Sequence, residues 1–330
     1  MSKAVEIINA LVSPANKLID AVTGAIGKAY QPRHIRKVAE AKVHEINVVG
    51  QALRDNADVP IVYDKGELSL NTTDFDEFVK RTQSRLAYQE LQKQQNIENV
   101  ADKAYELLEN ETECSSEPIS QDWMTRFFNS VEDISNEDMQ ILWSRILAGE
   151  IKQPNTYSLR TLEVLRNLTP YEANVFQHVC SAVISYNGEC FLPTNRNLLR
   201  KNSIMHNAIL SLQDCGLLML GINSVYGVEV NIEGEIFLNN EHLALIIRRK
   251  NNRKSMRLKC YPLTRAGIDL ASIISAKYSD AFILSLAEYL KEEHKDTVVE
   301  VEEISNVDEN YIWTTGENLL EKERTQNDQL

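Results

Sequence analysis

The sequence lacks the short motifs that mark the common catalytic and nucleotide-binding sites. It contains no G-x-x-x-x-G-K-[ST] phosphate loop, no G-x-G-x-x-G dinucleotide fingerprint, no H-E-x-x-H zinc motif and no G-x-S-x-G nucleophile elbow. Its histidines show no spacing typical of metal ligands. We therefore expect a protein that is not an enzyme and that uses no cofactor, no metal and no small-molecule substrate.

Cysteine is also scarce. The five cysteines are scattered and form no C-x-x-C pair, which fits a reducing compartment better than a disulfide framework or a zinc knuckle. His178 and Cys180 are two residues apart on an expected helix, so their side chains face different directions and we expect packing rather than a thiol–imidazole pair.

Targeting and membrane signals are missing from the sequence as well. The start of the chain lacks the basic and apolar regions of a secretory signal, and no run of about 18 apolar residues occurs. We expect a cytoplasmic protein of bacterial type, with peripheral contact to the inner membrane as an open alternative.

Size and charge limit the possible functions further. With 330 residues, 43% of them hydrophobic, the chain can bury a core and has room for two domains or for one domain with extensions. The formal net charge of -13 means that the average surface repels nucleic acid and anionic lipid. Any such contact must therefore use a local basic patch.

The first thirty residues have an amphipathic helical pattern. Their small and apolar residues recur at alternating spacings of four and three, opposite a polar stripe with little charge, and Ser13–Pro14 predicts a helix start. The segment fits a helical hairpin packed on the body, or a seam for membrane or oligomer contact formed by Ile8, Leu11, Leu18 and Val22. A basic cluster follows within 31–42 and fits a juxtamembrane patch or a solvated face.

A long helix is predicted from Asp74 to Glu111, because apolar residues recur there at helical spacing. The polar stretch 92–96 in its middle is expected to be solvated. The polar sequence from Glu109 to Pro118 predicts a linker after this helix.

The central stretch predicts several short helices. The first spans Asp122 to Val131, and the second starts at a capping box of Ser135 and Asp138 and ends at Gly149. A third helix then carries four leucines on one side, and the sequence 169–172, Thr-Pro-Tyr-Glu, predicts a capping box that opens a fourth. Every bulky residue of this stretch has a packing role, and the expected core consists of Trp123, Phe127, Trp143, Leu147 and Leu162.

These residues carry a resemblance to a known family. Asp122–Trp123, Phe127–Phe128 and the sequence QILWSRILAGEIKQPNTYSLRTLEVLRNLTPYEANVF, residues 140–176, resemble the core of the bacterial domain of unknown function 2806. Asn155 replaces an expected Gly in a loop. The resemblance implies no catalytic residues. Some similar helical proteins with an N-terminal amphipathic segment look like abortive phage infection proteins, which suggests a role in defence.

The last third of the chain changes character. Two short helices, Thr194 to Arg200 and Ser203 to Cys215, precede a predicted strand at 217–220. Alternating segments around 228–238 and 243–264 predict antiparallel strands with a hairpin tip at 251–252, and Thr264 predicts the N-cap of a helix over 265–276. A helix pair, a hairpin and a closing helix make a winged-helix-like arrangement.

The predicted hairpin is basic, and two interpretations of it remain open. A wing could bring the cations to nucleic-acid phosphates, or a solvated hairpin could pair with the acidic C-terminal tail. The residues concerned are Arg248, Arg249, Lys250, Arg253, Lys254, Arg257 and Lys259.

The sequence therefore predicts a mainly α protein: an N-terminal helical region and a central helical bundle, followed by a small α+β winged-helix-like domain. The expected divisions are residues 1–58, 59–116, 117–186, 187–277 and 278–330. The favoured function is a non-enzymatic defence effector or scaffold whose N-terminal segment contacts membrane or oligomerises and whose C-terminal domain senses a protein partner. A DNA-binding regulator that uses the basic hairpin is the alternative.

Overall fold

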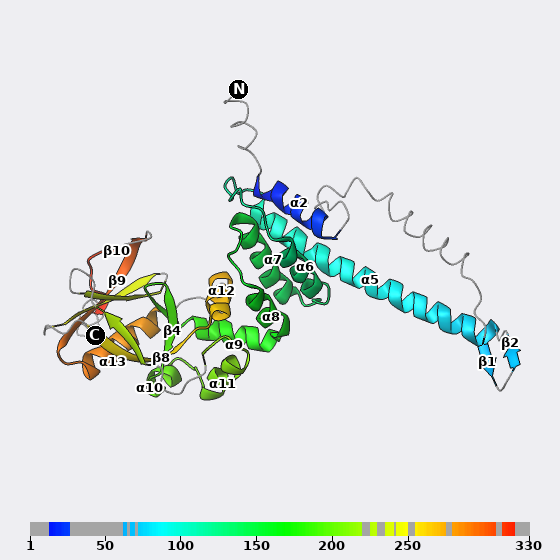
Figure 1. Cartoon of the computed structure of the whole chain (residues 1–330). Coiled ribbons are helices and arrows are strands. Elements are labelled where there is room, and N and C mark those ends of the chain that lie inside the picture. The colour runs from blue at the N-terminus through cyan, green and yellow to red at the C-terminus, as the bar shows by residue number, and fades with distance from the viewer. Residues whose placement is uncertain are drawn as a thin grey trace, which may run out of the picture. The chain divides into compact units, whose positions relative to one another are not determined.

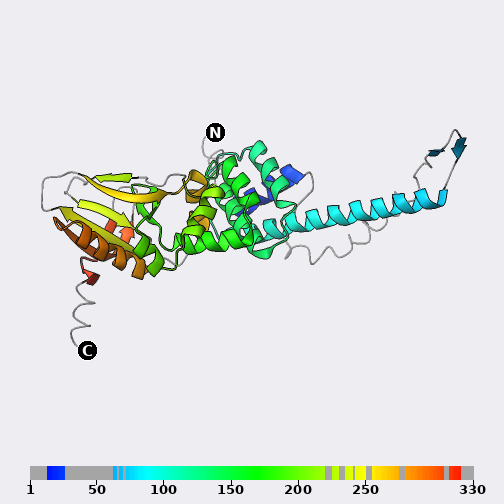
Figure 2. The same cartoon turned by 90° about the horizontal axis from the view of Figure 1, so that it is seen from below.

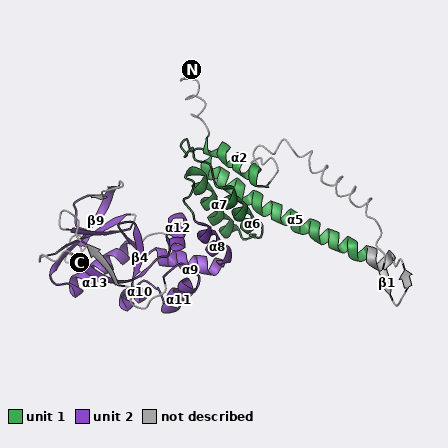
Figure 3. Ribbon diagram, viewed as in Figure 1, with its two compact units in different colours: residues 1–157 green, residues 158–330 purple. Residues whose placement is uncertain are grey.

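The computed structural model describes the chain as two compact units, residues 1–157 and 158–330 (Figure 3). The described part of unit 1 is helical apart from one two-stranded hairpin, and unit 2 combines helices with an antiparallel sheet (Figure 1). The expectation of a mainly helical protein with β structure in its C-terminal part is confirmed. The residues described are 13–26, 62–64, 67–69, 72–219, 225–229, 235–240, 242–249, 255–274, 279–307 and 312–320.

Unit 1 is organised around one long helix. Helix α5 (Thr72–Leu108) is about 55 Å long at 1.5 Å per residue. Helices α2, α6 and α7 all pack against it, and α2 also packs against α6 and α7. The buried side chains of α5 begin at Asn96, and its N-terminal half extends beyond α6 and α7 (Figures 1 and 2). The other elements are α2 (Pro14–Ile26), β1 (Val62–Asp64), β2 (Glu67–Ser69), α6 (Gln121–Val131) and α7 (Glu137–Lys152).

Aromatic rings form the centre of the unit 1 core. The rings of Trp123 and Phe127 stack with centroids 5.1 Å apart, and Phe127 meets Trp143 edge to face at 5.3 Å. Such offset and edge-to-face pairs add to the free energy gained by burying the rings. Trp143 is completely buried, as the sequence predicted.

Helix α2 begins as expected at Ser13–Pro14, where the Ser13 hydroxyl accepts a hydrogen bond from Asn16 N at 3.3 Å. The Nζ of Lys17 donates to the carbonyl of Ser115 at 2.8 Å. Ser115 N in turn donates to the carbonyl of Lys152 at 2.8 Å. The predicted linker Glu109–Pro118 therefore lies within unit 1, where it is bonded to both α2 and α7.

The predicted bounds of α7 are wrong at both ends. Its N-cap is Asn136, whose side chain accepts from Met139 N, and not Ser135. The helix continues through Gly149 to Lys152, so this glycine does not end it. The reason for a glycine there is spatial, because the ring of Tyr157 lies where a β-carbon would be.

Unit 2 begins with helices whose ends are set by side-chain caps. Thr169, Pro170 and Glu172 form the predicted capping box at the start of α9, and Thr264 caps α12 as expected. Gly216, at φ +75°, follows α11 in the left-handed conformation that glycine adopts without strain. The helices are α8 (Leu159–Asn167), α9 (Pro170–Cys180), α10 (Arg196–Lys201), α11 (His206–Asp214), α12 (Arg265–Ile273) and α13 (Asp280–Glu293).

The sheet of unit 2 is antiparallel throughout, in the order β10-β9-β7-β6-β3-β4-β8-β5. Helix α13 packs against β7 and β9, and residues 243–247 of β7 are all buried. The strands are β3 (Ile184–Tyr186), β4 (Glu189–Pro193), β5 (Val225–Glu229), β6 (Glu235–Asn239), β7 (Leu243–Arg249), β8 (Ser255–Pro262), β9 (Thr297–Val307) and β10 (Ile312–Thr314).

Two strand predictions in this region are wrong. Strands β7 and β8 do not pair as a hairpin, because β7 lies between β6 and β9 whereas β8 lies between β4 and β5. Residues 217–219 form no strand beyond a single bridge between Leu218 and Leu263. Consecutive apolar strands do not show from sequence alone which neighbour each one pairs with.

Candidate functional site

The family-like stretch is held together by a buried carboxylate, that of Glu150 in α7. Its two oxygens accept hydrogen bonds from Asn155 N at 2.7 Å and from Tyr157 N at 3.0 Å. Burial raises the pKa of this carboxyl, and the backbone donors offset part of that shift. Asn155 has a φ of 68°, a conformation that suits the glycine expected there and that asparagine also tolerates. Glu150 therefore organises the loop that follows α7.

The same loop is tied to α6 through an aromatic side chain. Trp123 Nε1 donates to the carbonyl of Tyr157 at 2.9 Å. All five expected core residues are buried: Trp123, Phe127, Trp143, Leu147 and Leu162. These contacts account for the bulky residues of the stretch by packing and hydrogen bonding.

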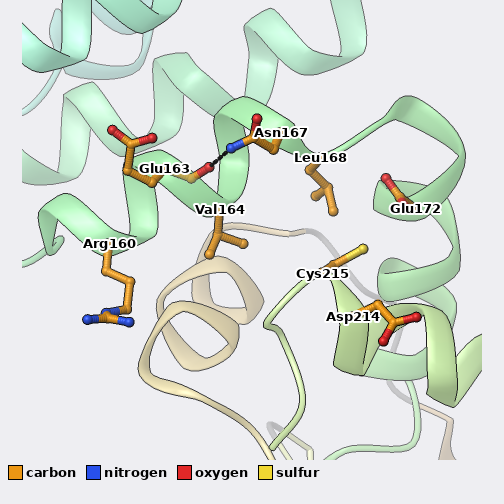
Figure 4. Close-up of a pocket in the computed structure, with 8 residues that line it drawn as sticks. All are labelled: Arg160, Glu163, Val164, Asn167, Leu168, Glu172, Asp214 and Cys215. Atoms are coloured by element: carbon orange, nitrogen blue, oxygen red, sulfur yellow. Dashed lines mark hydrogen bonds between the residues drawn. The ribbon is translucent and has the colours of Figure 1, made fainter.

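Unit 2 has a groove of about 470 Å³ formed by α8, the start of α9 and the end of α11 (Figure 4). Val164 and Leu168 supply apolar surface, and Arg160 supplies the one basic group. The rest of the lining consists of one amide, three carboxylates and one thiol, which belong to Asn167, Glu163, Glu172, Asp214 and Cys215.

The chemistry of this groove does not suit nucleophilic catalysis. Burial and the neighbouring carboxylate of Glu172 raise the pKa of Cys215 to about 11, so the sulfur is a neutral thiol near pH 7, whereas the thiolate is the nucleophile. The carboxyl of Glu172 has a lowered pKa, because the Thr169 hydroxyl and backbone and the Cys215 thiol donate hydrogen bonds to it. Glu172 is thereby engaged in capping α9.

The strand order separates the described members of the predicted basic cluster. Arg248 on β7 is ion-paired to Glu235 of β6 and to Glu300 of β9, so carboxylates on both neighbouring strands neutralise it. Arg257 and Lys259 lie on β8, where both are exposed. Arg249 is the last residue of β7, and its side chain lies outside the described residues. Lys250, Arg253 and Lys254 also lie outside them.

The predicted N-terminal seam is only partly described. Leu18 and Val22 are completely buried, and α2 packs against α5, α6 and α7. Ile8 and Leu11 lie outside the described residues. The structure thus places the described half of the seam inside the core of unit 1.

An exposed apolar stripe on α5 was missed by the sequence reasoning. Phe78 and Leu86 are 58% and 48% exposed, and Val79 and Thr82 are half-buried between them. At 3.6 residues per turn these four positions fall within an arc of about 120° that also contains the buried positions of the C-terminal half. Those buried positions are Ile97, Val100, Ala104 and Leu108.

The edge of the unit 1 body on α5 is marked by polar contacts. Lys93 Nζ binds the carboxylate of Glu132, after α6, at 2.9 Å, and Asn96 donates to the carbonyl of Glu132 at 2.8 Å. Beyond this edge α5 continues for about six turns, and these turns carry the apolar stripe. The continuing helical spacing from 75 to 86 was the available signal, but the sequence does not show where the neighbouring helices stop.

The described part of the chain contains no candidate metal site and no candidate membrane span. No group of three or more His, Cys, Asp or Glu side chains is placed to hold a metal ion there. No described helix combines the length and the apolar character needed to cross a bilayer.

The sequence matches the model of a protein family. The sequence model of the family described as "Protein of unknown function (DUF2806)" matches residues 80–287, which is more than half of the chain. The matched span runs from α5 to α13 and so includes Glu150, the unit 2 groove and most of the sheet. No curated protein and no solved structure matches the chain.

Proposed function

The chain belongs to the DUF2806 family, whose function is unknown, and from that premise we propose that it is a non-enzymatic scaffold whose protein-contact surface is the projecting half of α5. The observation that carries the proposal is the stripe of Phe78, Val79, Thr82 and Leu86, which continues the packing face of α5 beyond the unit 1 body. Large apolar side chains grouped on an exposed helix face are typical of protein interaction sites.

The groups of the unit 2 groove support the non-enzymatic part of the proposal. Its one thiol is protonated near pH 7, and the carboxylate of Glu172 is occupied by capping hydrogen bonds. A nucleophile would need an adjacent base or a lowered pKa, and Cys215 has the opposite shift.

Photo-crosslinking in living cells tests the contact surface. A benzophenone amino acid replaces Phe78 in one version of the full chain and Leu91 in another. Leu91 is 56% exposed on the same helix but lies about 140° around it from Phe78. We expect protein adducts of increased mass from position 78 and few from position 91. Equal adduct yields, or reaction only within the same chain, would contradict the proposal.

We place this scaffold in antiviral defence, on the resemblance of the sequence to abortive-infection-like proteins, with unit 2 as the part that senses a partner. A phage plaque assay with cells expressing the chain tests this setting. We expect protection that is lost in Leu86→Gln and kept in Leu91→Gln. Unchanged plaque counts with the wild-type chain would remove the defence role and leave the scaffold proposal standing.

A nucleic-acid-binding role is the second candidate, and the strand order favours it. Helix α9, strand β4, helices α10 and α11, then β5 and β8 occur in this order along the chain, with β3 before β4 and β6–β7 before β8. In the sheet, β8 lies between β4 and β5. We interpret this order as that of a winged helix, with β5 and β8 as wing strands and β6–β7 inserted between them. Arg257 and Lys259 project from β8 and would meet phosphates.

Fluorescence anisotropy with a labelled DNA duplex tests this second role. We expect Arg257→Ala with Lys259→Ala to weaken binding and to reduce the slope of log affinity against log salt by about two. The exposed residues of α11, among them Leu210 and Asp214, include no lysine or arginine that could contact bases. We therefore expect that binding depends little on the DNA sequence. Absence of binding by the wild-type chain at low salt would end this candidate.

A further inference from the structure

Helix α10 carries the exposed cations that α11 lacks. We propose that the exposed face of α10, with Arg196, Arg200 and Lys201, contacts the phosphates of a DNA duplex beside β8. The inference rests on the nucleic-acid role of unit 2 given above as the second candidate. It adds a contact element that lies outside the predicted basic hairpin.

The stretch around α10 is basic in a chain that is acidic as a whole. Residues 190–213 contain no aspartate and no glutamate, whereas the whole chain has 48 acidic and 35 basic residues. Arg196, Arg200 and Lys201 are all exposed, and none of them forms an ion pair with another described residue. Helix α10 packs on α13, yet the exposed carboxylates of α13, such as that of Glu288, do not pair with these cations. Their charge is therefore not neutralised by the described part of the chain.

The three cations share one side of α10. At 3.6 residues per turn, Arg196 and Arg200 are about 40° apart around the helix, and Lys201 lies about 100° beyond Arg200. The buried residues Leu198 and Leu199, each 5% exposed, occupy the opposite side. Packing thus turns the basic side of the helix toward solvent.

Helix α10 begins next to the exposed cations of β8. Thr194 N donates to the carbonyl of Lys259 at 3.0 Å, and α10 starts two residues later at Arg196. Two residues span at most about 7 Å, and each DNA strand carries a phosphate about every 3.4 Å along its axis. The side chains of Arg196 and Lys259 can therefore reach phosphates of the same duplex.

The connection between α10 and α11 favours a duplex as the ligand. The two helices are joined by the short turn 202–205, in which Ser203 has a φ of 59°. Two helices joined by a turn of about three or four residues form a helix-turn-helix, and its first helix crosses the DNA backbone. Cations on α10, the first helix of this pair, are thus placed for phosphate contacts.

A lipid surface suits this face of α10 less well. Helices that lie on a membrane insert apolar side chains beside their basic ones. The exposed residues of α10 are all polar: Arg196, Asn197, Arg200 and Lys201. Asparagine, like arginine and lysine, commonly contacts DNA phosphates. The composition of the face therefore favours nucleic acid over a bilayer.

Fluorescence anisotropy of the full chain with a labelled DNA duplex of mixed sequence, at several salt concentrations, tests the proposal. We expect Arg196→Ala with Arg200→Ala to reduce the slope of log affinity against log salt by about two, because two phosphate contacts are lost. Adding Arg257→Ala and Lys259→Ala should make the reduction about twice as large, because both elements contact one duplex. Arg196→Lys with Arg200→Lys keeps the charges and should keep most of the slope.

The loss of two exposed cations elsewhere in unit 2 is the matched control. Arg166 of α8 and Lys295 after α13 are both exposed. Arg166→Ala with Lys295→Ala makes the same change in net charge and should alter the slope by less than about 0.5. Circular dichroism melts check that every variant is folded. A control pair that reduces the slope as much as the α10 pair overturns the proposal.

The remaining outcomes separate this inference from the nucleic-acid role itself. A slope that falls with the β8 pair but not with the α10 pair overturns the contact of α10 and leaves the role standing. Absence of binding by the wild-type chain at low salt overturns both. Vesicles of phosphatidylserine and phosphatidylcholine supply the comparison with a lipid surface. If the α10 pair weakens vesicle binding and leaves DNA binding unchanged, α10 faces a membrane and the proposal is wrong.

Discussion

Gly149 lies so close to the ring of Tyr157 that a residue with a β-carbon does not fit at position 149. A β-carbon at Gly149 would lie 2.7 Å from both Cε2 and Oη of Tyr157. The main chain of Tyr157 is held from two sides, because its N–H donates to Glu150 and its carbonyl accepts from Trp123. The ring has little freedom to move away, so the glycine is required by the packing of the loop on α7.

Gly149→Ala should therefore destabilise unit 1 even though alanine is the better helix former. Overpacking in a core costs about 1 to 3 kcal/mol, which exceeds the gain of about 1 kcal/mol in helix propensity. Gly24 in α2 is the matched control, because its β-carbon would meet nothing within 4 Å. Gly24→Ala should raise the free energy of unfolding by about 0.5 to 1 kcal/mol. Urea denaturation of both variants measures the change in the free energy of unfolding. A change of the same sign in both variants would contradict the steric role of Gly149.

Substitution by phenylalanine should reduce the stability of the protein by different amounts at the two core tryptophans, Trp123 and Trp143. Trp123→Phe removes the hydrogen bond to the Tyr157 carbonyl as well as ring volume, whereas Trp143 Nε1 has no hydrogen-bond partner among the described residues. We expect Trp123→Phe to cost about 1 to 3 kcal/mol more than Trp143→Phe, because a buried acceptor is left unpaired. Thermal denaturation compares the two, and a greater loss for Trp143→Phe would contradict the prediction.

Complete removal of the Trp143 ring should be far more damaging. Trp143→Ala should cost about 3 to 5 kcal/mol, as large aromatic truncations in cores do, and abolish soluble expression. A soluble and fully stable Trp143→Ala protein would instead make this residue part of a binding surface.

The local features of the fold were predictable where one short stretch determines them. The capping box of Thr169 and Glu172, the N-cap of Thr264 and the glycine after α11 follow from neighbouring residues alone. Gly149 misled the prediction because the ring that requires it is eight residues away. The partners of β7 and β8 were missed for a similar reason, since β9 and β4 lie far from them in the sequence.

The candidate sites depended even more on distant contacts. The basic residues could be counted from the sequence, but the pairing of Arg248 with Glu300 joins positions 52 residues apart. The stripe on α5 is exposed because the helices that pack on α5 do not extend beyond Lys93. No property of residues 78–86 reveals that boundary.

The capping box of α9 should make stability depend on acidity. Its hydrogen bonds hold the pKa of Glu172 below the ordinary value, so their contribution is present above that value and is lost as the pH falls through the lowered pKa. Glu172→Gln should cost about 0.5 to 1 kcal/mol at pH 7. The difference from the wild type should shrink below about pH 4. Denaturation at several pH values measures it.

The partner residue supplies the control for that experiment. Thr169 gives Glu172 both its hydroxyl and its backbone N–H. In a Thr169→Ala background, the additional cost of Glu172→Gln should be smaller than in the wild type, because the hydroxyl contact is already gone. Equal costs in both backgrounds would show that the two residues are not coupled.

A substitution at Leu18 can show whether the N-terminal segment packs on the body of the protein or acts at a membrane. Its side chain is completely buried in unit 1, so Leu18→Glu places an unpaired charge in the core and should cost about 3 to 5 kcal/mol. Asn16→Glu, two residues away on the exposed side of α2, should change the free energy of unfolding by less than about 0.5 kcal/mol. Circular dichroism melts and liposome leakage assays on both variants decide between the alternatives. A Leu18→Glu protein that melts like the wild type but no longer permeabilises liposomes would mean that α2 leaves the core to act at a membrane.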